Sequence, residues 1–258
     1  MPFGAASRPA GAARKALRPL ADGLLAILLA PVCAACKRPL TTPCLGIVCN
    51  DCWEAVRPIP PPFCAVCSDP LLSWRQSSER CADCRLKRPH IAAGRTVGKY
   101  DGPLRSILQA FKYDRRRSLA VPLGRLMQLR GAAVLADADC VVPVPLHWRR
   151  RWRRGFNQAL DLARQLGKPV RCVLRRRRNT RTQTDLPAEA RLRNVRDAFV
   201  ATRRTRVSGL RIVLVDDVST TGATLEACAR VLVAAGAAEV RTLTAARVST
   251  SPPAARRR

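Results

Sequence analysis

Two adjacent carboxylates and a hydroxyl-rich loop form the most informative stretch of the sequence. Asp216 and Asp217 follow an apolar run, Ile212 to Val215, which predicts a buried strand that leads into the acid pair. The loop contains a glycine, which lets the backbone fold tightly around a ligand. The amphipathic helix that follows directs its positive dipole end toward a phosphate. The loop residues are Ser219, Thr220, Thr221, Gly222, Ala223 and Thr224.

Acidic and hydroxyl groups in this order suit a sugar phosphate. The carboxylates of Asp216 and Asp217 can accept hydrogen bonds from sugar hydroxyls while the loop surrounds the phosphate. The Gly-Lys pair of nucleoside triphosphate loops is absent from this stretch, and so is the GxGxxG pattern of dinucleotide-binding folds. The alternative is an ordinary strand, loop and helix in which the hydroxyl residues occur by chance.

Eight cysteines form four pairs, each with two residues between its sulfurs. This spacing lets both thiolates of a pair face one ion, and a structural zinc needs four such ligands in a tetrahedron. The gaps between successive pairs predict two tandem zinc sites, with cross-braced pairing as the alternative. The pairs are Cys33 and Cys36, Cys49 and Cys52, Cys64 and Cys67, and Cys81 and Cys84.

Other uses of the cysteines explain the spacing less well. A disulfide framework would suit a secreted protein, and iron–sulfur ligation would not explain two ribbon-like halves. Zinc would stabilise a Pro-rich segment that has too few apolar residues for a core of its own. Cys44 is left over, and we expect Cys140, Cys172 and Cys228 to be small core residues.

A basic segment with two tryptophans follows an earlier predicted strand, Asp139 to Val144. Its arginines can stabilise the charge on a leaving pyrophosphate, whereas its tryptophans can stack on bases of single-stranded nucleic acid. A solvated basic surface is the third interpretation. The residues expected to contact pyrophosphate or nucleic acid are Pro143, His147, Trp148, Arg149, Trp152, Arg153, Arg154, Gly155, Asn157 and Gln158.

A second basic segment, Arg175 to Val200, is polar and has no strong periodicity. Such a segment predicts a mobile flap over the site. The flap residues that we single out are Arg178, Asn179, Thr180 and Gln183.

Strands that alternate with helices from Ile91 onward must position these residues. The alternation predicts an α/β domain with a mostly parallel sheet flanked by helices. The expected strands are Arg95 to Tyr100, Asp139 to Val144, Arg211 to Val215 and Glu239 to Val248. The expected helices are Pro103 to Phe111, Leu119 to Leu129, Asn157 to Leu166 and Thr224 to Ala235.

Composition divides the chain into four parts. We expect a disordered basic N-terminus (1–16), a short helix with a double zinc ribbon (17–89), the α/β domain (90–248) and a basic tail (249–258). The apolar run Leu24 to Val32 is too short to span a bilayer, so no transmembrane span is expected. A signal peptide is the alternative to a helix, Leu17 to Leu29, packed on the cysteine module.

The charge of the chain favours polyanionic partners. Lys and Arg total 47 against 18 acidic residues, which gives a formal net charge of +29. This excess predicts attraction to nucleic acid, phosphorylated metabolites or an anionic membrane surface. A codon preference for Arg is the alternative explanation for scattered arginines, but not for dense clusters.

The stretch VDDVSTTGAT resembles the signature of type I phosphoribosyltransferases, which bind phosphoribosyl pyrophosphate (PRPP). The resemblance implies that Asp216 and Asp217 bind the ribose hydroxyls and that Ser219 through Thr224 hold the 5-phosphate. It also implies that Mg²⁺ accompanies PRPP. Some purine-specific members carry a carboxylate where this chain has Thr220, which argues against purine salvage.

The combination of motifs resembles the ComF family more closely. Cysteine ribbons precede VPVPLH and RGFNQA, RNTRTQTDL and RLRNVRDAF, and finally VDDVSTTGAT. The resemblance implies a cytoplasmic protein that joins a double zinc ribbon to a type I phosphoribosyltransferase-like fold. It implies roles in DNA uptake and natural transformation, or in nucleoside metabolism, with single-stranded DNA and other competence proteins as partners.

Two classes of function follow. The first is a phosphoribosyltransferase with an unknown acceptor, for which His147, beside the predicted pyrophosphate loop, is the better placed of two histidines to act as a base. The second is a non-catalytic module that binds single-stranded DNA and uses PRPP or a nucleotide as a ligand.

Overall fold

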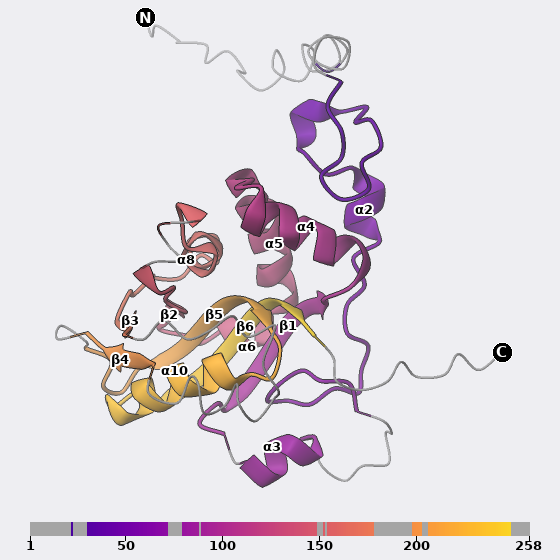
Figure 1. Ribbon diagram of the computed structural model, residues 1–258. Helices are drawn as coiled ribbons and strands as arrows, with labels where there is room; N and C mark the ends of the chain where they lie inside the picture. Colours follow the sequence, from indigo (N-terminus) through magenta and orange to yellow (C-terminus); the bar gives the residue numbers. More distant parts are fainter. Residues whose placement is uncertain are drawn as a thin grey trace, which may run out of the picture. The chain divides into compact units, whose positions relative to one another are not determined.

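The computed structural model describes residues 22, 30–71, 79–87, 89–148, 152, 154–177, 198–202 and 206–248. The chain forms two compact units, residues 1–55 and 56–258 (Figure 1). The predicted N-terminal segment 1–16 and tail 249–258 lie outside the described residues, as does the predicted helix Leu17 to Leu29 apart from Asp22. The four-part division by composition stays a prediction.

The described part of the smaller unit from residue 30 to residue 55 has little regular structure. This part contains a short 3-10 helix, η1 (Pro43–Leu45), and the helix α2 (Asn50–Glu54). Leu40 and Val48 are among its few buried apolar residues. A core this small needs cross-links for stability.

A four-stranded parallel sheet forms the centre of the larger unit, which confirms the predicted α/β fold. The strand order is β1-β6-β5-β2. The strands are β1 (Ala93–Lys99), β2 (Cys140–Pro143), β5 (Arg211–Ser219) and β6 (Glu239–Arg247). β5 is longer than predicted, because its pairing with β6 continues past the acid pair to Ser219.

Helices flank this sheet. α10 packs against β5 and β6, whereas α5 packs against β1 and β6, and α8 against β2 and β5. The helices are α4 (Gly102–Tyr113), α5 (Ala120–Arg130), α6 (Ala132–Leu135), α8 (Gln158–Ala163) and α10 (Ala223–Ala234). The short 3-10 helix η2 (Arg117–Leu119) precedes α5.

Two short strands were not predicted from the sequence. β3 (Leu174–Arg176) and β4 (Phe199–Ala201) pair in antiparallel fashion. They lie at the two ends of the predicted flap, where only three residues each leave no clear alternation to detect. The four flap residues singled out above lie outside the described part of the chain.

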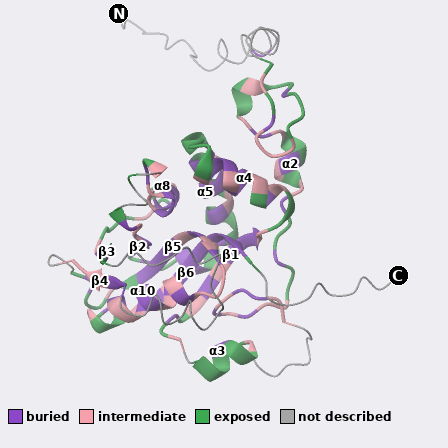
Figure 2. Cartoon of the chain, in the orientation of Figure 1, coloured by how far each residue is buried: buried purple, intermediate pink, exposed green. Residues whose placement is uncertain are grey.

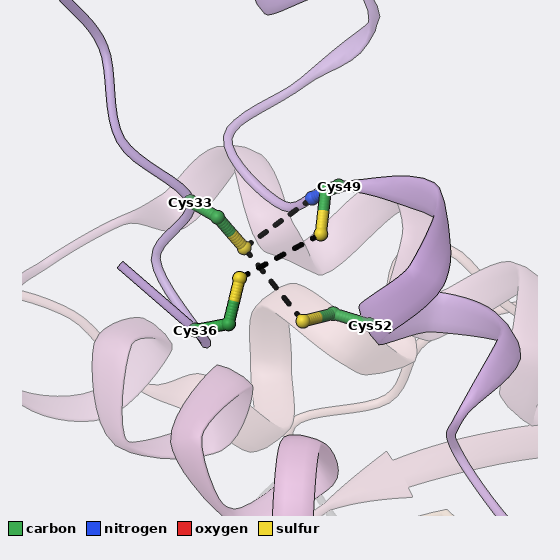
Figure 3. Close-up of side chains that lie close together, drawn as sticks. All are labelled: Cys33, Cys36, Cys49 and Cys52. Atoms are coloured by element: carbon green, nitrogen blue, oxygen red, sulfur yellow. Dashed lines mark hydrogen bonds between the residues drawn. The ribbon is translucent and has the colours of Figure 1, made fainter. Parts of the chain in front are cut away.

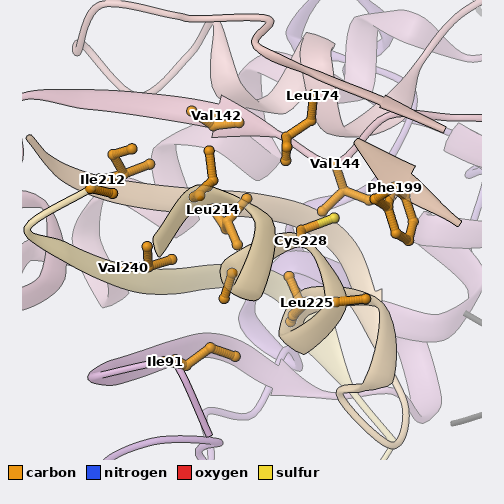
Figure 4. Packing of buried hydrophobic residues seen from close by; sticks show 14 of the residues in the cluster. Ile91, Val142, Val144, Leu174, Phe199, Ile212, Leu214, Leu225, Cys228 and Val240 are labelled. Carbon is orange, nitrogen blue, oxygen red and sulfur yellow. The ribbon is translucent and has the colours of Figure 1, made fainter. Parts of the chain in front are cut away.

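The two faces of β5 have different neighbours. β5 is buried over most of its length (Figure 2). Ile212 and Leu214 belong to a buried cluster with Leu225 and Cys228 of α10 (Figure 4). Because side chains alternate along a strand, Val213 and its odd-numbered neighbours face the opposite layer. This alternation decides where the acid pair points.

Two of the three isolated cysteines are core residues. Cys140 and Cys228 are completely buried, as predicted. The prediction for Cys172 is wrong, because this residue is exposed in the segment that precedes β3.

The second cysteine ribbon is part of the larger unit. It includes the helix α3 (Ala82–Lys87), and its Cys64, Val66 and Cys84 join the same buried cluster as β5. Gly94 of β1 permits this contact, since a Cβ there would lie 2.3 Å from the Val66 carbonyl oxygen. The ribbon and the sheet therefore fold around one core.

Among the described residues, no helix is long and apolar enough to cross a membrane.

Candidate functional site

The two predicted acids lie within β5 and point to opposite faces of the sheet. Asp216 continues the row of Ile212 and Leu214 toward α10, and its charge raises the pKa of the Cys228 thiol after the larger effect of burial. Asp217 faces the other layer and is 8% exposed. The two carboxylates therefore face different layers of the fold, close to the end of β5.

Lys112 of α4 pairs with the second acid. Its Nζ lies 2.9 Å from the Asp217 Oδ2, and the two side chains are 15% and 11% exposed. Burial disfavours the ammonium charge, but the Asp217 carboxylate outweighs it and raises the pKa of Lys112. This residue was not predicted from the sequence. The sequence signal that could have identified Lys112 is its spacing. Lys112 follows the buried Leu104 and Leu108 at intervals of four residues, so it lies on the same face of the helix.

The first acid has an unusual protonation equilibrium. Burial and the neighbouring Asp217 charge raise the pKa of Asp216 to about 7, against opposing effects of Lys112 and Arg176. Asp216 is therefore partly protonated near neutral pH. A ligand that donates hydrogen bonds, or a cation, would favour its ionised form.

Arg176 is the second charged residue that sequence analysis missed. It is buried at the end of β3, its guanidinium lies 5.3 Å from the centre of the Phe199 ring, and its charge acts on Asp216. Arg176 lies at the start of the predicted flap, next to the last residue that the structure describes there. It is one of four consecutive arginines, and nothing in the sequence distinguishes it from the other three.

The loop after β5 places the predicted phosphate-binding residues at the N-terminus of α10. Gly222 has a φ of 77° and directly precedes α10, a conformation that favours glycine. The Thr221 Oγ1 accepts a hydrogen bond from the Ala223 N–H at 3.4 Å. Ser219 ends β5 and Thr224 lies in the first turn of α10, so the predicted residues Ser219 through Thr224 stand together at a helix N-terminus.

The segment after β2 reaches the same edge of the sheet. Pro143 ends β2 opposite Val215, just before the acid pair of β5. Asn157 caps the N-terminus of α8: its Oδ1 accepts from the Ala159 N–H, and its Nδ2 donates to the Val144 carbonyl. The parallel pairing therefore brings the predicted pyrophosphate segment beside the predicted sugar-phosphate site.

Polar groups of this segment lie near Lys112. Arg154 stacks 5.6 Å from the centre of the Tyr113 ring, and its charge acts on Lys112. Its Nη1 lies 3.4 Å from the Gln158 Oε1. The Gln158 Nε2 is buried and has no hydrogen-bond acceptor within the described parts of the chain. Gly155 has a φ of 81°.

The tryptophans of the segment are exposed and its histidine is not. Trp148 and Trp152 are 63% and 89% exposed, which leaves their faces open for stacking. His147 is 4% exposed, with its ring centre 5.7 Å from that of Trp148. Arg149 and Arg153 lie outside the described residues.

The first cysteine cluster has the dimensions of a zinc site. The Sγ atoms of Cys33 and Cys52 lie 3.9 Å apart, and those of Cys36 and Cys49 lie 3.8 Å apart (Figure 3). Four sulfurs about 2.3 Å from a tetrahedral zinc lie about 3.8 Å from one another. The four thiols therefore fit one zinc ion.

The second cluster repeats this geometry within the larger unit. Its sulfurs lie within 4.8 Å of one another, and those of Cys67 and Cys81 are 3.7 Å apart. Sequential pairing is confirmed: one cluster is Cys33, Cys36, Cys49 and Cys52, and the other is Cys64, Cys67, Cys81 and Cys84.

A buried arginine connects the second ribbon to the loop. The Arg247 Nε lies 3.3 Å from the Asp69 Oδ1, and its Nη1 lies 3.5 Å from the Ser219 Oγ. Asp69 in turn accepts a backbone hydrogen bond from Cys64. The ribbon and the end of β5 thus share one guanidinium, a contact between distant segments that the sequence did not predict.

Comparison with known proteins agrees with this architecture. Residues 24–85 match the double zinc ribbon domain, and residues 152–256 match the phosphoribosyl transferase domain. The fold and the site define a class of proteins in which a double zinc ribbon accompanies a phosphoribosyltransferase-like domain.

Named relatives narrow this class. DNA utilization protein YhgH of Escherichia coli (strain K12) is 36% identical over 220 residues, which cover 81% of this chain and 94% of the relative. Competence protein F of Haemophilus influenzae is 30% identical over 81% of this chain and 93% of its own length. Competence protein ComFC of Bacillus subtilis is 30% identical over 74% of this chain and 80% of its own length. The chain belongs to this ComF family.

Proposed function

We propose that the larger unit binds PRPP together with Mg²⁺. The observation that carries the proposal is the acid pair of β5 followed by a hydroxyl and glycine loop at the N-terminus of α10. Asp216 and Asp217 would accept hydrogen bonds from the two ribose hydroxyls, one from each face of the strand. Ser219, Thr220, Thr221, Gly222, Ala223 and Thr224 would hold the 5-phosphate.

The segment after β2 would hold the pyrophosphate. Arg154 supplies positive charge beside Lys112, and the buried Gln158 Nε2 supplies a donor that lacks an acceptor among the described residues. Mg²⁺ prefers phosphate and carboxylate oxygens and keeps several waters. It would therefore be held by the pyrophosphate and an acid of β5 rather than by a set of protein ligands.

A transferase reaction would use the same groups. The bond from the ribose C1 to pyrophosphate would break as an acceptor nitrogen forms a bond to C1, and pyrophosphate would leave with the bonding electrons. The arginine and lysine charges would stabilise the leaving group. His147 is buried, so a role as proton acceptor would require the segment around it to move.

A role with DNA is supported by the relatives and by the surface. Relatives are named for DNA utilization and competence, the formal net charge is +29, and Trp148 and Trp152 are exposed. We infer that the protein works in the cytoplasm on single-stranded DNA, alongside other competence proteins. Purine salvage fits less well, because Thr220 replaces an acid.

The second candidate is a non-catalytic single-strand binding module with PRPP or a nucleotide as ligand. It is favoured by the two exposed tryptophans, which suit stacking on bases. The candidates differ in pyrophosphate release. Incubation of the zinc-loaded protein with PRPP, Mg²⁺ and a panel of bases or DNA ends would release pyrophosphate only if a transfer occurs.

Thermal unfolding tests the binding site that both candidates share. PRPP with Mg²⁺ is expected to raise the melting temperature of the wild type but not of the Asp216→Asn, Asp217→Asn double variant. Equal shifts in the two proteins would contradict the assignment of the site to the acid pair.

A further inference from the structure

A cavity of about 580 Å³ lies between the second cysteine ribbon and the loop that leads into α10. Residues 66–71 of the ribbon form one wall, and Thr242 and Thr244 of β6 form part of another. The volume lies within the range of roughly 300 to 1,000 Å³ that is usual for small-molecule sites. The loop side is lined by Ser219, Thr221, Gly222 and Ala223.

The cavity borders the predicted phosphate loop and not the acids that are predicted to bind the sugar. It shares residues with the phosphate loop, but Asp216 and Asp217 do not line it. A phosphate in the loop would therefore have the sugar-binding acids on one side and this cavity on the other. A group that fills the cavity would be joined to the phosphate through its second ester bond.

The lining of the cavity carries no net positive charge. Its three basic side chains are matched by three acidic ones, and Cys67, Cys81 and Cys84 of the second zinc cluster also line it. Lys87 Nζ lies 2.6 Å from the Asp83 Oδ2, and the Arg247 Nε lies 3.3 Å from the Asp69 Oδ1. The third acid, Glu226, accepts from His90. A zinc ion with four thiolates carries a net charge of about −2, so the lining suits an uncharged group and not a second phosphate.

The surfaces of the cavity suit a planar ring with polar edges. Val66, Ile91 and Leu225 supply apolar walls and are each less than 8% exposed. Thr242 and Thr244 supply hydroxyl groups at 5% and 3% exposure. Apolar walls with a few polar groups are typical of sites for aromatic heterocycles.

Arg247 stands where the cavity meets the loop. Its Nη1 lies 3.5 Å from the Ser219 Oγ, and the residue lines the cavity. A phosphodiester passing from the loop into the cavity would lie beside this guanidinium, which suits phosphate oxygens.

We propose that this cavity binds the base of the second-to-last nucleotide at the 3′ end of a single strand. The phosphodiester of the last nucleotide occupies the loop, and its free 3′-hydroxyl donates to the acid pair. An internal DNA sugar has no free hydroxyl, so only a strand end satisfies the acids. The inference rests on the proposed function, because the phosphate uses the same loop as PRPP.

Calorimetric titration of the full zinc-loaded chain tests the proposal. The probes are the mononucleotide thymidine 5′-(methyl phosphate) and the dinucleotide TpT with a free 3′-hydroxyl, which carry the same phosphodiester charge and differ by the nucleoside placed in the cavity. Because stacking or burial of one base contributes roughly 1–3 kcal/mol, TpT should bind at least about fivefold more tightly. TpT with a 3′-phosphate should lose at least about tenfold in affinity, because the acid pair then meets an anion.

A matched pair of variants locates the effect. Leu71→Trp fills the cavity, whereas Leu129→Trp places the same ring on an exposed site of α5 that is 72% exposed in the native protein. Leu71→Trp should abolish the advantage of TpT over the mononucleotide and change PRPP affinity by less than about twofold. Leu129→Trp should leave both unchanged. Metal analysis confirms that each variant keeps its zinc.

A second variant tests the cavity if Leu71→Trp does not fold. Thr242→Val with Thr244→Val removes the hydroxyl groups with little change in volume, and it should weaken TpT binding but not that of the mononucleotide. TpT binding no tighter than the mononucleotide in the wild type, or equal effects of the two Trp variants, would overturn the proposal. Absence of PRPP binding with cavity-dependent TpT binding would instead contradict the proposed function alone.

Discussion

The Lys112 Nζ lies 2.9 Å from the Asp217 Oδ2, so a lysine from α4 holds one carboxylate of the β5 acid pair in place. Asp216 points to the other face of the same strand and does not pair with this lysine directly. The two acids therefore differ: one is held as an ion pair, and burial raises the pKa of the other to about 7. A sugar with two adjacent hydroxyls would meet one carboxylate that is paired with a lysine and one that is not.

Removal of Lys112 should destabilise the larger unit. Lys112→Met leaves the largely buried Asp217 carboxylate without its cation, and breaking such a pair costs about 3–5 kcal/mol. The Lys87 and Asp83 side chains are 55% and 74% exposed, so Lys87→Met should cost less than about 1 kcal/mol. Urea unfolding of the two variants measures the difference, and equal losses would show that the Lys112 pair contributes no more than a surface pair.

Ligand affinity should depend on the ionisation of Asp216. With a pKa of about 7, the ionised fraction rises from roughly one tenth at pH 6 to nine tenths at pH 8. If the carboxylate accepts a ribose hydroxyl or binds Mg²⁺, PRPP affinity should rise about tenfold over that interval. Titration of PRPP at each pH measures the rise. Asp216→Asn should bind PRPP weakly, and its affinity should rise with pH only as far as the phosphates of PRPP themselves ionise. An equal rise in affinity in both proteins would exclude Asp216 as the titrating group.

Loss of zinc from the second ribbon should weaken PRPP binding, whereas loss of zinc from the first ribbon should not. Cys67→Ser disturbs the cluster that shares a core with the sheet and is joined to Ser219 through Arg247 and Asp69. Cys36→Ser is the matched change in the smaller unit. Cys67→Ser should weaken PRPP binding and lower the melting temperature of the larger unit. Metal analysis checks the zinc content and should find about two zinc ions per wild-type chain. A comparable loss of binding in Cys36→Ser would contradict this distinction.

The exposed tryptophans should contribute to single-strand affinity. Trp148→Ala with Trp152→Ala removes two rings, and each stacked base contributes roughly 1–3 kcal/mol, so affinity for oligothymidylate should fall at least about tenfold. Fluorescence anisotropy at two salt concentrations measures this loss and the steep salt dependence expected of phosphate contacts. Leu129→Ala with Val121→Ala, two exposed apolar sites on α5, is the control. Unchanged affinity in the tryptophan variant would refute stacking.

Elements with strong local patterns were predictable from the sequence. The apolar run before Asp216, the hydroxyl and glycine loop and the repeated cysteine pairs each depend on neighbours in sequence. Their geometry agrees with the prediction, although β5 extends through the acids because β6 pairs along its whole length.

Features that depend on distant contacts were not predictable. Lys112 sits on a helix whose apolar face was recognised, but its partner lies 105 positions later and only the parallel sheet brings them together. Arg247 meets Asp69 across 178 positions. The exposure of Cys172 was also missed, because apolar sequence neighbours do not establish burial when the segment runs along an edge of the fold.

Calorimetric titration of PRPP with Mg²⁺ into the full zinc-loaded chain tests the central claim most directly. The wild type should bind one PRPP per chain, and Asp216→Asn with Asp217→Asn should lose at least about tenfold in affinity. Asp137→Asn, which alters an acid that pairs with Arg211 and Arg241 instead, should bind as the wild type does. No binding to the wild type, or equal binding to the double variant, would contradict the account.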